Sequence, residues 1–138
     1  MSGPDFLDTN VLVYAYAPAD ARKHKIAQEI VERAVTGEGI VSSQVLAEFA
    51  ATLLHKTAPP MRPEEVKIAL DALGPLKLVG LDHGVVRRAV EARAAYGIHF
   101  YDGMIVAAAE RGGCKRILSE DLNPGQKYFQ VIVENPFV

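Results

Sequence analysis

Residues 6–10 read Phe-Leu-Asp-Thr-Asn, and residues 116–121 read Arg-Ile-Leu-Ser-Glu-Asp. In both places a short apolar run, of the kind that forms a buried strand, ends close to an aspartate. If the two runs lie parallel in one sheet, Asp8 and Asp121 project at the same edge. Binding sites of open α/β sheets form at that edge, beyond the carboxyl ends of the strands. These two segments therefore locate a candidate site, and each aspartate alone is also typical of a turn or a helix N-cap.

Outward from these segments, short apolar runs alternate with helical patterns along the chain. Further strands are predicted at 39–42, 76–79 and 129–133. Helices are predicted over 22–35, from Ser42 or Ser43 onward, from Pro63 onward, over 82–96 and over 101–111. The first strand is followed by the segment 11–16, which ends before Pro18. Strands that alternate with helices favour a parallel sheet covered on both faces. We therefore predict an α/β fold, a three-layer α/β/α sandwich with a central, mostly parallel sheet of about five strands.

Length and composition are those of one globular domain. The chain has 138 residues, of which 49% are hydrophobic and 23% charged, so we expect a single domain over 1–138 and no disordered architecture. The longest apolar run, 103–109, is too short to span a membrane. Acids at Asp5 and Asp8 argue against a secretory signal, and the lone Cys114 cannot form an internal disulfide. We expect a cytoplasmic protein with no membrane partner.

The net charge is the one property that argues against a nucleic-acid partner. Fifteen basic residues face seventeen acidic ones, which gives −2 at pH 7. A dedicated nucleic-acid binder normally carries a positive footprint. Composition alone therefore leaves the substrate open.

Asp102 opens the most apolar helix, residues 102–109. At 100° per residue it lies at the edge of the apolar stripe that includes Ile105 and Ala109. Burying a neutral polar group without a hydrogen bond costs about 2–7 kcal/mol, and burying a charge costs more. A carboxylate turned toward the core is therefore costly unless it is paired or binds a metal. A helix N-cap is the alternative role for this residue.

Glu48 is a weaker candidate by pattern. On its helix it falls opposite the apolar side formed by Leu46, Phe49 and Leu53, so periodicity alone predicts a solvated glutamate. Carboxylates gathered at one sheet edge repel one another, and Mg²⁺ or Mn²⁺ relieves that repulsion. Such an ion can bind a phosphodiester oxygen and activate an attacking water. The acids therefore favour a metal-dependent enzyme acting on phosphate esters.

The same residues resemble a known family. The segments 6–14, 43–49, 101–109 and 118–122, in this order, resemble the signature of the PIN domain, and 133–137 is similar to the end of its bacterial members. The resemblance covers nearly the whole chain. It implies a metal-dependent endoribonuclease similar to the VapC toxins of toxin–antitoxin pairs.

The resemblance also implies roles for particular residues. It places Asp8, Glu48, Asp102 and Asp121 around one or two Mg²⁺ or Mn²⁺ ions as catalytic metal ligands, and it favours Asp121 over Glu120. The residues implied to support the site by hydrogen bonding are Thr9, Asn10 and Ser43. The partners that it implies are an RNA substrate, a small cognate antitoxin and a second copy of the chain in a homodimer. With the four acids set aside, 13 acidic residues face 15 basic ones, so the remaining surface is slightly positive.

Two other classes of function stay open. A phosphohydrolase with an aspartyl nucleophile also begins with an aspartate after its first strand, but it needs a second acid where Asn10 stands. A binding module with the same fold and no catalysis is the other alternative. Assistance from His99 or Glu120, base stacking by Tyr14 or Tyr16, and contact of the basic groups at 22–25 and 87–93 with an RNA backbone are further possibilities.

Overall fold

The computed structural model describes residues 3–138, so the first two residues of the predicted domain lie outside the described part. Its centre is a six-stranded sheet in the order β3-β2-β1-β4-β6-β5. The strands are β1 (Asp5–Leu7), β2 (Ile40–Ser42), β3 (Lys77–Val79), β4 (Arg116–Leu118), β5 (Lys127–Tyr128) and β6 (Val131–Glu134). All neighbours pair in parallel except β5 and β6, which are antiparallel.

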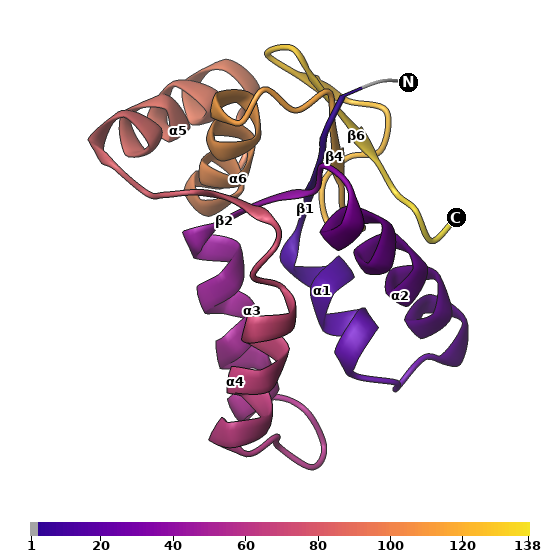
Figure 1. The fold of residues 1–138 in the computed structure, drawn as a ribbon. Coiled ribbons are helices and arrows are strands. Elements are labelled where there is room, and N and C mark those ends of the chain that lie inside the picture. The colour runs from indigo at the N-terminus through magenta and orange to yellow at the C-terminus, as the bar shows by residue number, and fades with distance from the viewer. Residues whose placement is uncertain (1–2) are drawn as a thin grey trace.

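Within residues 3–138, the sheet is accompanied by six helices. They are α1 (Thr9–Tyr16), α2 (Ala21–Thr36), α3 (Ser43–His55), α4 (Pro63–Ala72), α5 (His83–Tyr96) and α6 (Phe100–Arg111). Figure 1 shows α5 and α6 together on one side of the strands and α1 and α2 on the other, while α3 and α4 extend side by side away from the sheet. The predicted three-layer, mostly parallel α/β architecture is confirmed.

The sheet has one strand more than the five predicted. The predicted strand at 129–133 begins only at Val131, because Phe129 adopts a left-handed conformation with φ of 54° and turns the chain. The two residues before this turn form β5, which pairs back onto β6. A strand of two residues shows no alternation of apolar and polar side chains, so the sequence pattern does not reveal it.

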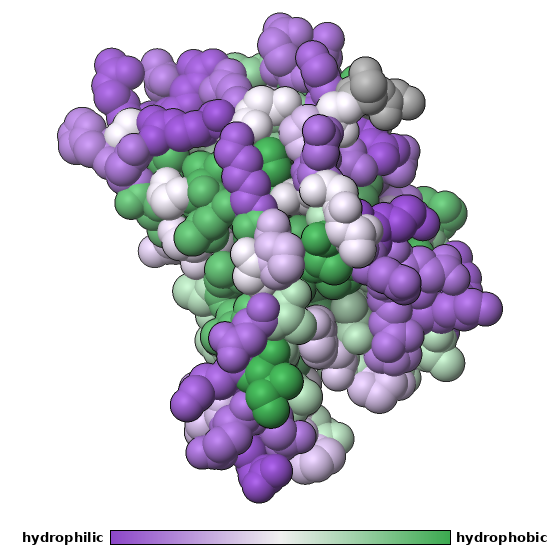
Figure 2. All heavy atoms as spheres, in the orientation of Figure 1, coloured by the Kyte–Doolittle hydropathy of each residue, from purple (hydrophilic) through white to green (hydrophobic). Residues whose placement is uncertain are grey.

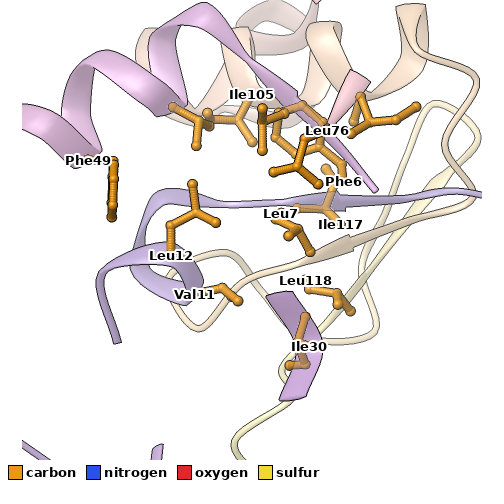
Figure 3. Close-up of a cluster of buried hydrophobic side chains, with 14 of the residues drawn as sticks. Phe6, Leu7, Val11, Leu12, Ile30, Phe49, Leu76, Ile105, Ile117 and Leu118 are labelled. Carbon is orange, nitrogen blue, oxygen red and sulfur yellow. The ribbon is translucent and has the colours of Figure 1, made fainter. Parts of the chain in front are cut away.

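The core lies on both faces of the sheet. Phe6 and Leu7 are adjacent in β1, so their side chains point to opposite faces, and neither is exposed to solvent. Figure 3 shows Phe6 on the side of Ile105 and Leu7 on the side of Leu118 and Ile30. Burying each such side chain contributes about 1.5–3 kcal/mol. A strand that is buried on both faces explains the continuous apolar run from which its position was predicted.

The register of β1 and β4 fixes the edge where the candidate residues emerge. Leu7 pairs with Leu118, and the backbone N–H of Asp8 donates to the carbonyl of Leu118 at 3.0 Å. Asp8 and Ser119 therefore leave the sheet side by side, as the parallel arrangement predicts.

Within residues 3–138, no helix has both the length and the hydrophobicity that crossing a membrane requires.

Helices α5 and α6 approach each other closely at Gly103. A Cβ atom added to Gly103 would lie 2.7 Å from the carbonyl oxygen of Ala89, which is backbone and cannot turn aside. The packing of α6 against α5 therefore depends on the missing side chain.

We predict that Gly103→Ala destabilises the fold. Overpacking costs about 1–3 kcal/mol, and the better helix propensity of alanine returns only about 1 kcal/mol. The expected net loss is up to about 2 kcal/mol in the free energy of unfolding, measured by urea denaturation. Gly80→Ala is the matched control, since nothing lies within 4 Å of its added Cβ. A Gly103→Ala variant as stable as the wild type would contradict this description of the interface.

Candidate functional site

Asp8 is the buried centre of the candidate site. It is the N-cap of α1, and its Oδ1 accepts a hydrogen bond from the backbone N–H of Thr9 at 2.7 Å. Its Oδ2 accepts from the hydroxyl of Ser119 at 2.7 Å. Asp8 is 7% exposed. The N-cap role and the candidate-site role, which the sequence left as alternatives, therefore belong to the same carboxylate.

Ser119 is a residue of this cluster that the sequence prediction did not single out. Its side chain has no exposure to solvent. Besides donating to Asp8, its hydroxyl oxygen accepts from the backbone N–H groups of Asp121 at 3.1 Å and Leu122 at 3.4 Å. Its position directly after β4, opposite Asp8 in the parallel register, is the signal that could have found it. Ser119 fixes the loop that carries Asp121 relative to Asp8.

The first turn of α1 connects two of the other acids, Glu48 and Asp121, to Asp8. The hydroxyl of Thr9 donates to Glu48 Oε1 at 2.8 Å. The amide of Asn10 donates to Asp121 Oδ2 at 3.1 Å, and its Oδ1 accepts from the backbone N–H of Glu120 at 3.3 Å. Thr9 and Asn10 thus hydrogen-bond to two of the four carboxylates that the sequence singles out.

Glu48 reaches the site from the exposed side of α3. The helix is capped by Ser42, whose hydroxyl accepts from the N–H of Val45 at 3.2 Å. Glu48 is exposed, as periodicity predicts, and nevertheless it accepts hydrogen bonds from Thr9 and from the amide of Gln44 at 3.3 Å. Solvent exposure and a place in the cluster are therefore compatible for this residue.

Ser43 lies differently from what the resemblance implies. Its hydroxyl accepts from the backbone N–H of Leu81 at 3.1 Å, which ties the start of α3 to the loop after β3. The structure shows it in contact with that loop rather than with the four acids.

Asp102 stands in the first turn of α6. The N-cap of this helix is His99, whose Nδ1 accepts from the N–H of Tyr101 at 3.2 Å, so the N-cap role considered for Asp102 falls to another residue. Asp102 is half-buried. The positive end of the helix dipole favours its charged form by about 0.3–1 kcal/mol.

The electrostatics of these carboxyl groups show that they share one site. Burial raises the pKa of Asp8 to about 6, and the charges of Asp121 and Glu48 push it the same way, against the hydrogen bonds from Ser119 and Thr9. Burial also raises the pKa of Asp102, opposed by His99 and reinforced by Asp121 and Glu48. Asp121 and Glu48 therefore each lie close enough to repel both Asp8 and Asp102.

The donor set suits a hard divalent cation. Carboxylate oxygens are the ligands that Mg²⁺ and Mn²⁺ prefer, and a cation would relieve the repulsion that raises these pKa values. The side chains are nevertheless spread apart: in residues 3–138, no three His, Cys, Asp or Glu side chains are gathered as a ready-made metal site. Three of the carboxylates are held by hydrogen bonds from neutral donors: Glu48 by Thr9, Asp121 by Asn10 and Asp8 by Ser119.

Glu120 points into a separate cluster. It accepts from the hydroxyl of Tyr14 at 2.6 Å and forms an ion pair with Lys23 at 2.8 Å. Tyr14 also packs edge-on against Phe137, and Tyr16 packs edge-on against Phe49. Tyr14 and Tyr16 are therefore committed to packing rather than displayed for base stacking, and Glu120 anchors the loop that carries Asp121.

The basic groups noted in the sequence are also used within the fold. Arg22 donates to the carbonyl of Phe137, and Lys23 pairs with Glu120. Arg88 forms two hydrogen bonds with Glu110, at 2.8 and 2.9 Å, and lies 3.5 Å from the ring centre of Phe129. These side chains connect helices to the carboxyl-terminal segment.

A groove leads away from the carboxylates between α1 and α3. Its inner part, about 480 Å³, is bordered by Glu48 and Asp121. It continues into an outer part of about 740 Å³ that is largely apolar and reaches Tyr16 and Met61, with Lys56 bordering both parts. The candidate site therefore opens onto an extended surface rather than an enclosed pocket.

Comparison with known proteins agrees with this architecture. The sequence model of the PIN domain matches residues 6–129, and the chain therefore belongs to the PIN domain family. No curated protein sequence matches it significantly. The chain is similar to solved structures whose sequences differ widely from its own, so that likeness concerns the fold.

Three of these structures are toxin or toxin–antitoxin structures. The DNA-bound VapBC of Salmonella typhimurium is 19% identical with a TM-score of 0.68, over 98% of this chain and 99% of that one. A toxin–antitoxin complex from Klebsiella pneumoniae is 15% identical with a TM-score of 0.70, over 96% and 97%. VapC20 of Mycobacterium tuberculosis, a toxin that cleaves the sarcin–ricin loop, is 16% identical with a TM-score of 0.62, over 85% and 89%.

The raised pKa of Asp8 predicts how pH changes stability. The folded state holds the proton more tightly than the unfolded chain, whose Asp pKa is near 3.8, so stability is greatest below that value and falls as pH rises toward about 6. The full cost above pH 6 is about 3 kcal/mol. Asp8→Asn should therefore be more stable than the wild type at pH 7.5 in EDTA, by about 1–3 kcal/mol in urea denaturation.

Glu32→Gln removes an exposed carboxylate of α2 and is the control. Its stability relative to the wild type should not change between pH 4 and 6, whereas the advantage of Asp8→Asn over the wild type should grow across that interval. An advantage of Asp8→Asn that stays constant across the interval would contradict the assignment of a strained carboxylate at Asp8.

Proposed function

We propose that this protein is a divalent-metal-dependent endoribonuclease that hydrolyses RNA phosphodiester bonds. The observation that carries the proposal is the buried Asp8, whose raised pKa reflects desolvation and the charges of Asp121 and Glu48 at the carboxyl edge of the sheet. A site that strains its own carboxylates in this way is suited to a cation and, through the cation, to a phosphate.

Asp8, Asp102 and Asp121, with Glu48 directly or through water, would hold one or two Mg²⁺ or Mn²⁺ ions. When bound, the ion lowers the pKa of an attacking water and stabilises charge on the phosphate and the leaving oxygen. The chain's own contribution is positioning. Ser119 and the N–H of Thr9 hold both oxygens of Asp8, while the Thr9 hydroxyl and Asn10 orient Glu48 and Asp121.

The geometry favours hydrolysis by water over an aspartyl nucleophile. Both carboxylate oxygens of Asp8 accept hydrogen bonds at 2.7 Å, which lowers their nucleophilicity and fixes their direction. The position two residues on is occupied by Asn10, which orients Asp121 instead of supplying a second acid. No side chain of the protein is therefore required to form a covalent intermediate.

The partners that we propose are a small antitoxin and a second copy of the chain. The similar structures include a toxin–antitoxin complex and a DNA-bound VapBC. The apolar outer groove at Tyr16 and Met61 is suited to a peptide segment that would then cover the carboxylates. Co-purification with the product of a neighbouring reading frame tests this binding site. The wild type should co-purify with that product, and a Met61→Glu variant should not.

For the homodimer we propose the exposed apolar surface around α5. Figure 2 shows hydrophobic residues gathered in that region between hydrophilic ones, and the exposed large side chains there are Leu78, Leu81, Val86 and Val90. A monomer at micromolar concentration by light scattering would refute this assignment.

The single thiol, Cys114, is buried, which is consistent with the cytoplasmic location that we propose.

The function is tested by incubating the wild-type protein with RNA in Mg²⁺ or Mn²⁺ and in EDTA. We predict cleavage with either ion and none in EDTA. Asp8→Asn should lower the cleavage rate by at least about a hundredfold, because loss of a ligand exceeds the 10–100-fold cost typical of its supporting residues. The circular dichroism spectrum should stay unchanged.

A parallel assay with p-nitrophenyl phosphate separates the alternatives. Hydrolysis of this ester without cleavage of RNA would favour the phosphohydrolase. RNA binding without any cleavage would favour the binding module. Undiminished Mg²⁺-dependent cleavage by Asp8→Asn would sink the proposed mechanism.

A further inference from the structure

One aromatic ring beside the carboxylates is left in water. Tyr101 immediately precedes Asp102, and its side chain is 55% exposed. The other four tyrosines are half-buried or buried: Tyr14, Tyr16, Tyr96 and Tyr128. Each of these four packs edge-on against another aromatic ring, at centroid distances between 5.1 and 5.5 Å. Tyr101 therefore differs from them in exposing its ring at the mouth of the site.

The ring of Tyr101 is held by its neighbours. The imidazole of His99 stacks on it with a centroid distance of 5.7 Å and an interplanar angle of 23°, and Phe100 packs edge-on at 5.3 Å. Since His99 lies along one face and the side chain is still more than half exposed, its remaining surface is open to solvent. Little conformational entropy would then be lost when a planar ligand stacks on it.

The backbone of Tyr101 is tied to the acids. Its N–H donates to His99 at 3.2 Å, and its carbonyl accepts from Gln44 at 3.2 Å. The same amide of Gln44 donates to Glu48 at 3.3 Å, and Gln44 is 7% exposed. A buried side chain thus joins the residue that carries the open ring to one of the four carboxylates. The ring and the acids form one constructed unit.

We propose that Tyr101, backed by His99, is the stacking platform for an unpaired RNA base next to the phosphodiester that the carboxylates address. This inference rests on the proposed ribonuclease function and adds to it a residue that binds an unpaired base. Unstacked bases have two flat faces, and aromatic side chains bind them with little dependence on sequence. A base inside an A-form duplex has no free face to offer.

The surroundings favour a nucleobase over a protein segment as the occupant. Tyr101 and Asp102 are consecutive residues in the first turn of α6, so a base stacked on the ring would lie at the same helix end as the phosphate that we propose there. The apolar groove suited to a peptide leads the other way, along α1 and α3 toward Met61. The alternative role for Tyr101 is a contact with another protein, and the test distinguishes it from base stacking.

The test compares Tyr101→Phe, Tyr101→Leu and Tyr101→Ala in cleavage of a single-stranded RNA and of its duplex with Mg²⁺. Phenylalanine keeps the flat ring, leucine keeps apolar bulk without it, and alanine removes both. We expect Tyr101→Phe to match the wild type. Leucine and alanine should each raise the KM for single-stranded RNA by about tenfold with a smaller change in kcat. Ile68→Ala, at an exposed apolar residue of α4, is the control and should change neither constant.

Each result bears on whether Tyr101 stacks on an RNA base. Wild-type constants for Tyr101→Leu on single-stranded RNA would overturn stacking, and so would equal losses on the duplex. Tyr101 variants that keep the KM for RNA but lose self-association would assign the ring to a protein contact and overturn it too. A wild type that neither cleaves nor binds RNA would instead refute the ribonuclease proposal itself, so the two failures are distinguishable.

Discussion

The pairing of β1 with β4 is the contact on which the rest of the site depends. Leu7 lies opposite Leu118, and the first residues beyond them, Asp8 and Ser119, are joined by a hydrogen bond of 2.7 Å. A slip of one residue would turn every side chain of β1 to the opposite face and separate this pair. Such a slip is disfavoured because it would draw a carboxylate, Asp5 or Asp8, into one of the fully buried positions that Phe6 and Leu7 occupy. Core packing thereby fixes a polar contact at the end of the sheet.

A cost to stability is built into that contact. Burial disfavours the charged form of Asp8, and only two donors, Ser119 and the N–H of Thr9, offset it. The nearby Asp121 and Glu48 add repulsion in the same direction. Strain of this kind is typical of functional sites, where the fold holds groups in positions that they would not adopt for stability alone. The missing positive charge is what we propose a divalent cation supplies.

Much of this arrangement follows from sequence, and the remainder has identifiable causes. Strand ends predicted the places of Asp8 and Asp121, because parallel strands deliver their last residues to one edge. Helical periodicity placed Glu48 correctly on the exposed side of α3 but could not show that this side faces α1, where Thr9 contacts it. That contact depends on how two helices pack, which the pattern within one helix does not contain. The resemblance to a family supplied what periodicity could not.

Other residues escaped prediction for similar reasons. Ser119 carries no pattern of its own, and its role arises from the strand register. Strand-end position does not distinguish Glu120 from Asp121; the resemblance favours Asp121, and in the structure Glu120 pairs with Tyr14 and Lys23. Tyr14 and Tyr16 were candidates for base stacking, yet packing occupies them, while Tyr101 remains exposed beside Asp102. Long-range contacts, rather than local propensity, decide each of these cases.

If Asp8, Glu48, Asp102 and Asp121 together bind a divalent cation, that cation should stabilise the fold, which thermal unfolding in EDTA and in Mn²⁺ measures. At a Mn²⁺ concentration about 100 times the Kd, one bound ion adds about 2.7 kcal/mol, which raises Tm by about 5–10 °C for a chain of this size. We expect this rise for the wild type and its loss in Asp8→Asn. The same rise in both proteins, or none in the wild type, would contradict this expectation.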